Sequence, residues 1–308
     1  MKTISIVTPC FNEVDNIEEL SVLIQKTMTG LNYDYEHLFI DNGSVDGTVD
    51  KIRALAGKDT HIKAIINTRN FGHIRSPYYG LLQAGGDAVI ILASDLQDPP
   101  ERIPEFIREW ESGFKVVIGV KSKSKESGFF YFFRTLYYKT LRSLSDVELI
   151  EHFTGFGLYD QKVIEILRNL DDPYPYFRGL IADIGFPIAR IEFEQPRRKR
   201  GISKNNFFTL YDIAMLGLTG YTKVPLRIAT MFGFLSAGIS FLVGLIYLLY
   251  KLSDWQNFSL GLAPVVIGLF FLGSIQLIFL GIVGEYIGAI YTQVMHRPLV
   301  IEKERINF

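Results

Sequence analysis

Two aspartates, Asp95 and Asp98, stand three positions apart directly after an apolar stretch of the chain. Asp98 is followed by two prolines and Glu101, a pattern typical of a helix start, so we interpret Asp98 mainly as a helix N-cap. Nothing in the local pattern requires an acid at Asp95. Carboxylate and amide oxygens are the ligands that hard divalent cations prefer. Asp95 is therefore the better metal candidate, with Gln97 as a second ligand.

Two other apolar stretches also end in polar residues. Residues 3–10 lead into Phe11 and Glu13, and residues 35–41 lead into the segment 41–48. The segment 41–48 by itself could be a turn with a helix cap. If the stretches are parallel strands, however, their carboxyl ends meet at one edge of a sheet, where α/β proteins bind ligands. Together the three strand ends predict a binding site.

The first candidate strand is not followed by a glycine-rich phosphate loop of either common type. A nucleotide diphosphate at this edge would need its charge met by other means, most simply by a divalent metal on carboxylates. The formal net charge of −1 gives no overall basic field, so we expect no nucleic-acid partner. The single cysteine, Cys10, rules out a disulfide within the chain and suits a reducing compartment.

Residues 1–120 alternate between strand-like and helix-like patterns, which predicts an α/β domain built on an open parallel sheet. The stretch 87–94 is almost wholly apolar, as expected of a strand that is buried on both faces. The expected strands are 3–10, 35–41, 62–68, 87–94 and 114–120, and the expected helices are 15–29, 45–57, 76–84 and 99–112.

Two long stretches, 228–250 and 255–284, contain no charged side chain. At about 1.5 Å per helical residue, each can cross a hydrocarbon core of about 30 Å. We predict a hairpin of two transmembrane helices, at 228–250 and 262–284. The alternative is a pair of core helices in a soluble protein. Lysines and arginines flank the hairpin at both ends, so the positive-inside rule places both termini in the cytoplasm.

Residues 127–144 combine seven aromatic with three basic side chains, which favours a helix in the membrane interface. An aromatic core helix is the alternative. Small residues such as Gly233 and Gly273 in the membrane stretches favour close helix contacts and a homo-oligomer. We divide the chain into an α/β domain (1–205), an interfacial helix (206–226), the two membrane helices (227–290) and a cytoplasmic tail (291–308).

The motifs "VTPCFNE", "DNGSVDGT", "RNFGH", "SDLQDPPE", "RGL" and "RGISK" occur in this order along the chain. They resemble the polyprenyl-phosphate glycosyltransferases of glycosyltransferase family 2, relatives of dolichyl-phosphate mannose synthase. The stretch "GIVGEYIGAIYTQVMHRP" resembles the membrane-anchored bacterial branch with the bactoprenol glucosyltransferases. The resemblance covers essentially the whole chain. It implies a GT-A fold, a nucleotide-diphosphate-sugar donor, Mg²⁺ or Mn²⁺, and a polyprenyl phosphate acceptor in a lipid bilayer.

The resemblance also implies roles for individual residues. Asp41 and Asn42 match a pair of acids that reads the base and the ribose, and here the second acid is an amide. The basic loop at 195–205 matches a segment that binds phosphates; a surface turn beside anionic lipid is the alternative. The residues implied for the nucleotide sugar are Pro9, Phe11, Glu13, Asp41, Asn42, Ser94 and Asp95; those for the lipid phosphate are Arg178, Arg198, Arg200, Ser203 and Lys204; those for the metal are Asp95 and Gln97; and those for catalysis are Asp95, Arg198 and Lys204.

The chain departs from the family pattern at two places. Ala93 stands where relatives often have the first acid of Asp-x-Asp, which puts a metal site with two acids in doubt. The segment 154–160 lacks an acid and an arginine that relatives carry, although Asp160 remains, either as a helix cap or as a functional acid. The Gln-x-x-Arg-Trp signature of polysaccharide synthases is absent from the sequence.

We therefore expect inverting transfer of a hexose, with UDP-glucose as the donor, to undecaprenyl phosphate at the cytoplasmic face of the bacterial inner membrane. A phosphate monoester has a second pKa of about 6, so it is a dianion near neutral pH and needs no general base. One alternative is another donor: GDP-mannose, UDP-aminoarabinose or a UDP-N-acetylhexosamine. The other is a catalytically inactive membrane protein that binds nucleotide sugars.

Overall fold

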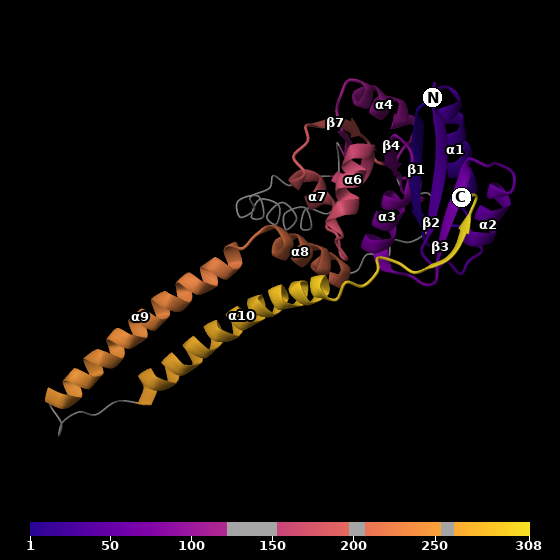
Figure 1. Cartoon of the computed structure of the whole chain (residues 1–308). Coiled ribbons are helices and arrows are strands. Elements are labelled where there is room, and N and C mark those ends of the chain that lie inside the picture. Colours follow the sequence, from indigo (N-terminus) through magenta and orange to yellow (C-terminus); the bar gives the residue numbers. More distant parts are fainter. Residues whose placement is uncertain (122–152, 197–206, 254–261) are drawn as a thin grey trace.

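The structure, a computed structural model, describes residues 1–121, 153–196, 207–253 and 262–308. In this part of the chain, an α/β domain carries two long helices that project from it as a hairpin (Figure 1). The predicted interfacial segment 127–144 lies outside the described residues.

The described strands form one mixed sheet in the order β7-β5-β6-β4-β1-β2-β3-β8. The four strands β4, β1, β2 and β3 are parallel, as the sequence predicts. The five strands expected from residues 1–120 all run in one direction, but the sheet as a whole is mixed, because β6 runs antiparallel to β4 and β5, and β8 runs antiparallel to β3. The strands are β1 (Thr3–Cys10), β2 (Asp34–Asp41), β3 (Ile62–Asn67), β4 (Ala88–Ile91), β5 (Val116–Lys121), β6 (Phe153–Asp160), β7 (Ile188–Phe193) and β8 (Glu302–Ile306).

Helices cover both faces of the sheet. Strand β1 shows why: its Ile4 and Ile6 pack into a cluster with α1 and α4, whereas Val7 packs into a cluster with α3, α6 and α7. Alternate residues of a strand point to opposite faces, so an apolar strand needs cover on both sides. The helices are α1 (Ile17–Thr29), α2 (Thr48–Ala56), α3 (Gly72–Gln83), α4 (Ile103–Glu111), α6 (Gln161–Leu170), α7 (Phe177–Asp183), α8 (Phe207–Tyr221), α9 (Val224–Ser253) and α10 (Leu262–Val294).

The helices α9 and α10 have the length and composition of membrane spans. The stretches Val224–Ser253 and Gly268–Val294 reach mean hydropathies of 2.1 and 1.8, and none of either apolar window is buried in the protein. Core helices of a soluble protein would be mostly buried, so that alternative does not fit. The exposed apolar surface of α9 and α10 instead supports association with a membrane.

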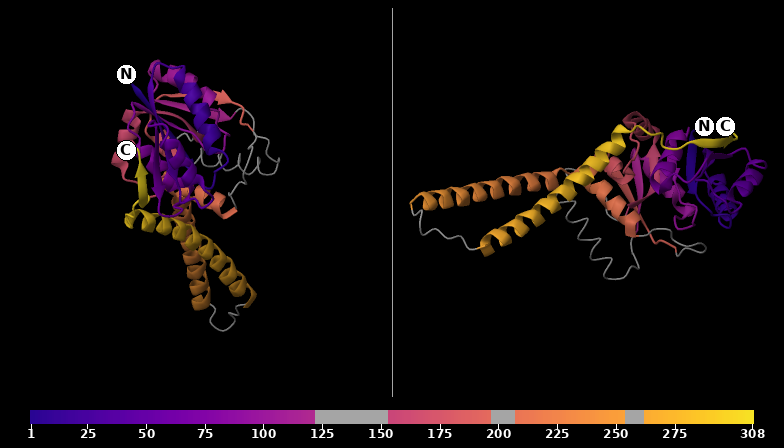
Figure 2. Two further views of the ribbon diagram at one scale, coloured as in Figure 1. Left: turned by 90° about the vertical axis from the view of Figure 1, so that its right-hand side faces the viewer. Right: turned by 90° about the horizontal axis from the view of Figure 1, so that it is seen from below.

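The described part of the predicted interfacial segment 206–226 forms α8, a short connection and the first residues of α9, at the base of the hairpin (Figure 2). The hydroxyl of Tyr211 on α8 donates to Glu285 on α10 at 2.7 Å. The hydroxyl of Tyr286 donates to the carbonyl of Thr222 at 2.6 Å. Helix α8 also packs against Tyr176, next to α7, through Leu216, Leu218 and Tyr221. Helix α8 therefore joins the hairpin to the α/β domain.

The chain returns from α10 to the α/β domain, where β8 pairs with β3 at the edge of the sheet (Figure 1). The tail expected at 291–308 thus contributes a strand. Two side chains one turn apart on α3 also contact it: Tyr79 donates to Glu302 at 2.6 Å, and Gln83 accepts from Arg305 at 2.8 Å. Helix α3 is therefore held between the sheet and the end of the chain.

The buried His37 predicts an acid-sensitive fold. Its side chain is 1% exposed, and burial lowers the pKa of the imidazole from 6.5 to about 3. Because the unfolded chain binds this proton below about pH 6.5 and the folded chain does not, stability falls as the pH falls below that value. We expect His37→Gln to remove about 2 kcal/mol of the stability difference between pH 7 and pH 5.

Thermal unfolding of the detergent-solubilised protein at both pH values measures this effect. His296→Gln is the matched control, because it makes the same substitution at an exposed histidine just after α10. An equal pH dependence in His37→Gln and the unmodified protein would contradict the prediction.

Candidate active site

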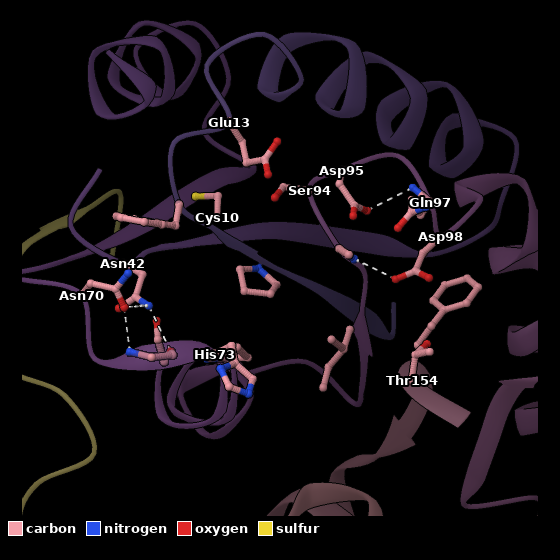
Figure 3. Close-up of a pocket in the computed structure, with 18 of the residues that line it drawn as sticks. Cys10, Glu13, Asn42, Asn70, His73, Ser94, Asp95, Gln97, Asp98 and Thr154 are labelled. Carbon is pink, nitrogen blue, oxygen red and sulfur yellow. Dashed lines mark hydrogen bonds between the residues drawn. The ribbon is translucent and has the colours of Figure 1, made fainter. Parts of the chain in front are cut away.

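A cavity of about 570 Å³ lies at the carboxyl ends of β1 and β4, beside the start of α3 (Figure 3). The parallel strands bring together residues that are far apart in the sequence, as the strand-end argument predicts. The cavity is lined by Pro9, Cys10, Phe11, Glu13, Asn42, Asn70, Gly72, His73, Ser76, Pro77, Ile91, Ala93, Ser94, Asp95, Gln97, Asp98, Lys121, Thr154, Phe156 and Gln195.

Asp95 and Gln97 share one tight turn at the cavity wall. Leu96 between them has a φ of 59°, an unusual left-handed conformation for leucine, and its side chain is buried. The turn is closed by the backbone N–H of Gln97, which donates to Oδ1 of Asp95 at 3.2 Å. Burial of Leu96 therefore leaves its two polar neighbours, Asp95 and Gln97, at the cavity.

Asp98 does not cap a helix, and the prediction that it does is wrong. Its Oδ2 accepts from the backbone N–H of Ala93 at 3.1 Å, and the following 3₁₀ turn, Pro100–Arg102, has no side-chain cap. An N-cap side chain accepts from the second or third N–H of the helix, and a proline there has none to give. Asp98 lines the cavity instead, and its burial raises the pKa of its carboxyl to about 6.

The charges that line the cavity are mainly negative. Glu13, Asp95 and Asp98 line it with carboxylates, against one described cation, Lys121. Within the described residues, no group of three or more histidine, cysteine, aspartate or glutamate side chains is placed to hold a metal. The oxygens of Asp95, Asp98 and Gln97 fit a hard divalent cation whose remaining ligands come from a substrate or water.

Asp41 and Asn42 have different places in the structure. Asp41 is fully buried and does not line the cavity: its Oδ1 accepts from the backbone N–H groups of Gly43 and Ser44 at 3.0 and 2.9 Å. Asn42 lines the cavity but is also fully engaged. Its Oδ1 accepts from the N–H of Phe71 at 2.8 Å.

Asn42 also holds the wall of the cavity. Its Nδ2 donates to Oδ1 of Asn70 and to the carbonyl of Gly72, both at 3.0 Å. These bonds fix the segment just before and at the start of α3, which lines the cavity. The sequence reasoning missed this role, because nothing in the sequence shows which loop an amide at a strand end will meet.

The other predicted residues divide into three groups. Pro9, Phe11, Glu13, Ser94, Asp95 and Gln97 all line the main cavity, as expected of neighbours at one sheet edge. Arg178 lines a second cavity instead. Arg198, Arg200, Ser203 and Lys204 lie outside the described residues, although the chain lines the main cavity at Gln195, just before them in the sequence.

The second cavity has a volume of about 190 Å³ and is largely aromatic. Tyr78, Tyr176 and Phe177 line it together with Arg178. It shares four lining residues with the main cavity, so the two are adjacent. The shared residues are His73, Pro77, Ile91 and Thr154.

Asp160 has a structural role. Its side chain accepts from the backbone N–H of Lys162 at 3.1 Å and so caps α6. It also accepts from Trp110 at 2.7 Å and from Lys115 at 2.8 Å. Of the two alternatives that the sequence left open, the structure supports the helix cap.

Comparisons with known proteins find one matching family model and relatives that cover nearly the whole chain. The sequence model of the family described as "Glycosyl transferase family 2" matches residues 5–167. A protein of Shigella phage SfV named "Bactoprenol glucosyl transferase" is 34% identical over 301 residues, which cover 97% of this chain and 98% of that protein. A Bacillus subtilis protein named "Uncharacterized glycosyltransferase YkcC" is 34% identical over 298 residues, which cover 96% and 92%.

Among solved structures, glucosyl-3-phosphoglycerate synthase from Mycobacterium tuberculosis aligns with a TM-score of 0.47 at 20% identity. The alignment covers 71% of this chain and 78% of that one.

The network around Asn42 predicts that an acid is not tolerated there. In Asn42→Asp, a carboxylate oxygen would face the carbonyl of Gly72 and Oδ1 of Asn70, both of which are acceptors. We expect a loss of about 2 kcal/mol or more in unfolding free energy, because two donors are removed and a buried charge is added. Thermal or denaturant unfolding measures the change.

Asn32→Asp is the matched control, since Asn32 is exposed and the substitution adds the same charge. If Asn42→Asp unfolds at the same temperature as Asn32→Asp, the interpretation of Asn42 as the residue that holds the cavity wall is wrong.

Proposed function

Because the chain belongs to glycosyltransferase family 2 and is a glycosyltransferase with the expected GT-A fold, we propose that it transfers a hexose to a polyprenyl phosphate. The proposed donor is UDP-glucose, and the proposed acceptor is undecaprenyl phosphate. The observation that carries the proposal is the adjacency of an acidic cavity to an aromatic cavity with an arginine, in a chain with two long apolar helices. The name of the Shigella phage relative agrees with this pairing of sugar and lipid.

The charges of the main cavity support a nucleotide-diphosphate donor with a divalent cation. A diphosphate beside Glu13, Asp95 and Asp98 would be repelled unless a cation came with it. We propose that Asp95 and Gln97 hold Mg²⁺ or Mn²⁺, with Asp98 beside them. Bound there, the ion would neutralise the diphosphate and stabilise the leaving nucleotide. Ala93 contributes no ligand, so donor oxygens complete the proposed site.

We place the nucleotide along Pro9, Phe11, Glu13 and Ser94, which line the same cavity. The proposed role of Asn42 is to shape this surface through the bonds it makes with Asn70 and Gly72. The proposed role of Asp41 is indirect, because its carboxylate accepts hydrogen bonds from the turn after β2.

The second cavity supports a lipid phosphate as the acceptor. Arg178 offers a cation, and Tyr78, Tyr176 and Phe177 offer an apolar surface for the first part of a lipid chain. Tyr176 also packs against α8 at the base of the hairpin, so this cavity lies toward the apolar helices. The basic loop with Arg198, Arg200, Ser203 and Lys204 is proposed to bind phosphates as well.

The proposed reaction is direct displacement at the anomeric carbon. The acceptor phosphate is a dianion near neutral pH, so no side chain has to remove a proton from it. The arginines hold it in line with the bond to the leaving nucleotide diphosphate. A bond forms between a phosphate oxygen and the anomeric carbon as the bond to the nucleotide diphosphate breaks, which inverts that carbon.

We further propose that the hairpin crosses the inner membrane and that both termini and the α/β domain lie in the cytoplasm. Strands β1 and β8 belong to one sheet, which supports a hairpin that returns to the side it left, with an even number of crossings. Basic residues flank both ends of the hairpin, in agreement with the positive-inside rule. Glycines that have open space beside them on α9 and α10, such as Gly233 and Gly273, support a proposed homo-oligomer.

The decisive experiment supplies the purified protein with undecaprenyl phosphate and a panel of radiolabelled nucleotide sugars, with and without EDTA. We expect label from UDP-glucose in the lipid, and its loss with EDTA. Label from GDP-mannose, UDP-aminoarabinose or a UDP-N-acetylhexosamine would change the donor but keep the reaction. Metal-dependent nucleotide binding without transfer from any donor would favour the inactive binding protein and overturn the proposal.

Asp95→Asn tests the proposed metal ligand. We expect a loss of at least about 100-fold in transfer with unchanged folding, because the substitution removes a charge that binds the cation. Asp50→Asn is the matched control: the Asp50 side chain is 82% exposed on α2 and should not affect transfer. Unreduced turnover by Asp95→Asn with saturating metal would refute the assignment.

A further inference from the structure

His73 lies where the two cavities meet. Of the four described residues that line both cavities, His73 and Thr154 have polar side chains, and His73 is the one that can ionise. Figure 3 shows the imidazole of His73 reaching into the main cavity from the start of α3, on the wall opposite Asp95. A molecule that reaches from one cavity to the other must pass His73.

The position of His73 is well fixed. It is the second residue of α3, and Asn42 holds the preceding Gly72 through its carbonyl. Gly72 itself has a φ of 91°, a conformation that residues with a Cβ rarely adopt. Farther along α3, Tyr79 and Gln83 contact the C-terminal segment. The imidazole is therefore carried by a helix that is anchored at its start and along its length.

The surroundings of His73 keep its imidazole neutral near pH 7. Partial burial lowers the pKa of His73, and the guanidinium of Arg178 lowers it further, whereas the carboxylate of Asp212 on α8 raises it. The net shift is downward. A neutral imidazole still offers one N–H donor, so it can bind a phosphate oxygen without adding a second positive charge beside Arg178.

We propose, on the basis of the function proposed above, that His73 binds the acceptor: its N–H donates to an oxygen of the lipid phosphate while Arg178 pairs with the charge. The donor diphosphate belongs to the opposite wall, at Asp95 and Gln97, so His73 is close to the acceptor side. A neutral hydrogen-bond donor such as His73 positions the lipid phosphate. It does not bind the phosphate as tightly before the reaction as a second cation would, so the phosphate stays nucleophilic.

The test compares His73→Leu with His73→Gln, which keeps an N–H donor. Initial rates of transfer are measured while undecaprenyl phosphate and the nucleotide sugar are varied separately. We expect His73→Leu to raise the KM for undecaprenyl phosphate by about tenfold to a hundredfold, the effect of losing a hydrogen bond to a charged group. The KM for the nucleotide sugar should stay within about twofold, and His73→Gln should recover part of the loss.

Two controls keep the result interpretable. Binding of UDP with Mn²⁺ to His73→Leu, measured by calorimetry, should match that of the unmodified protein and shows that the variant is folded. His61→Leu removes an exposed imidazole just before β3, at the end of that strand away from the cavity, and should leave both KM values unchanged.

An active His73→Leu with an unchanged KM for undecaprenyl phosphate would overturn this inference alone. A parallel rise in both KM values, or weakened UDP binding, would also overturn it, because His73 would then support the donor side. Absence of transfer by the unmodified protein, by contrast, would refute the proposed function itself.

Discussion

The parallel pairing of β1 with β2 and β4 is the constraint on which the site depends. Cys10 lies opposite Asp41 in this register, and Val7 lies opposite Ile91. Three chain segments therefore leave the sheet at one edge, although more than 80 positions separate the first from the last. A shift of one residue would turn the buried Ile4 and Ile6 to the other face, so the core fixes the register and, with it, the site.

The part of the fold that is local in sequence could be predicted from it. The first five strands are found at nearly their expected positions, because short crossovers and apolar runs leave few other arrangements. The sequence could not give β6 and β8, since each reaches the sheet after a long excursion and pairs antiparallel with a distant strand. The same distinction holds in the site. The position of Asp95 could be predicted from the strand that precedes it, whereas the role of Asn42 could not, because it depends on contacts with a loop that is distant in the sequence.

Asp98 shows how a good local rule can fail. An aspartate followed by two prolines and a glutamate is a pattern typical of a helix start. The prolines, however, have no backbone N–H from which the carboxylate of Asp98 could accept a hydrogen bond. The carboxylate turns to the N–H of Ala93 and so joins the cavity. The two walls of the connected cavities consequently differ in character: oxygens gather at the ends of β1 and β4, and nitrogen donors and aromatic rings gather around α3 and α7. Such a division suits the two anionic substrates proposed above, because each would find its own positive charge: a cation for the donor and Arg178 for the acceptor.

The strand β8 has a consequence for how the protein is made. It pairs with β3, whose other neighbour β2 is in place early, but β8 follows β3 by more than 200 positions and is synthesised much later. Until then the edge of β3 presents unpaired backbone groups, the kind of edge that promotes aggregation. Both long apolar helices precede β8 in the chain and are synthesised before it. The described sheet is thus completed only after the hairpin has been synthesised, and a chain that stops within the hairpin is left with an open edge.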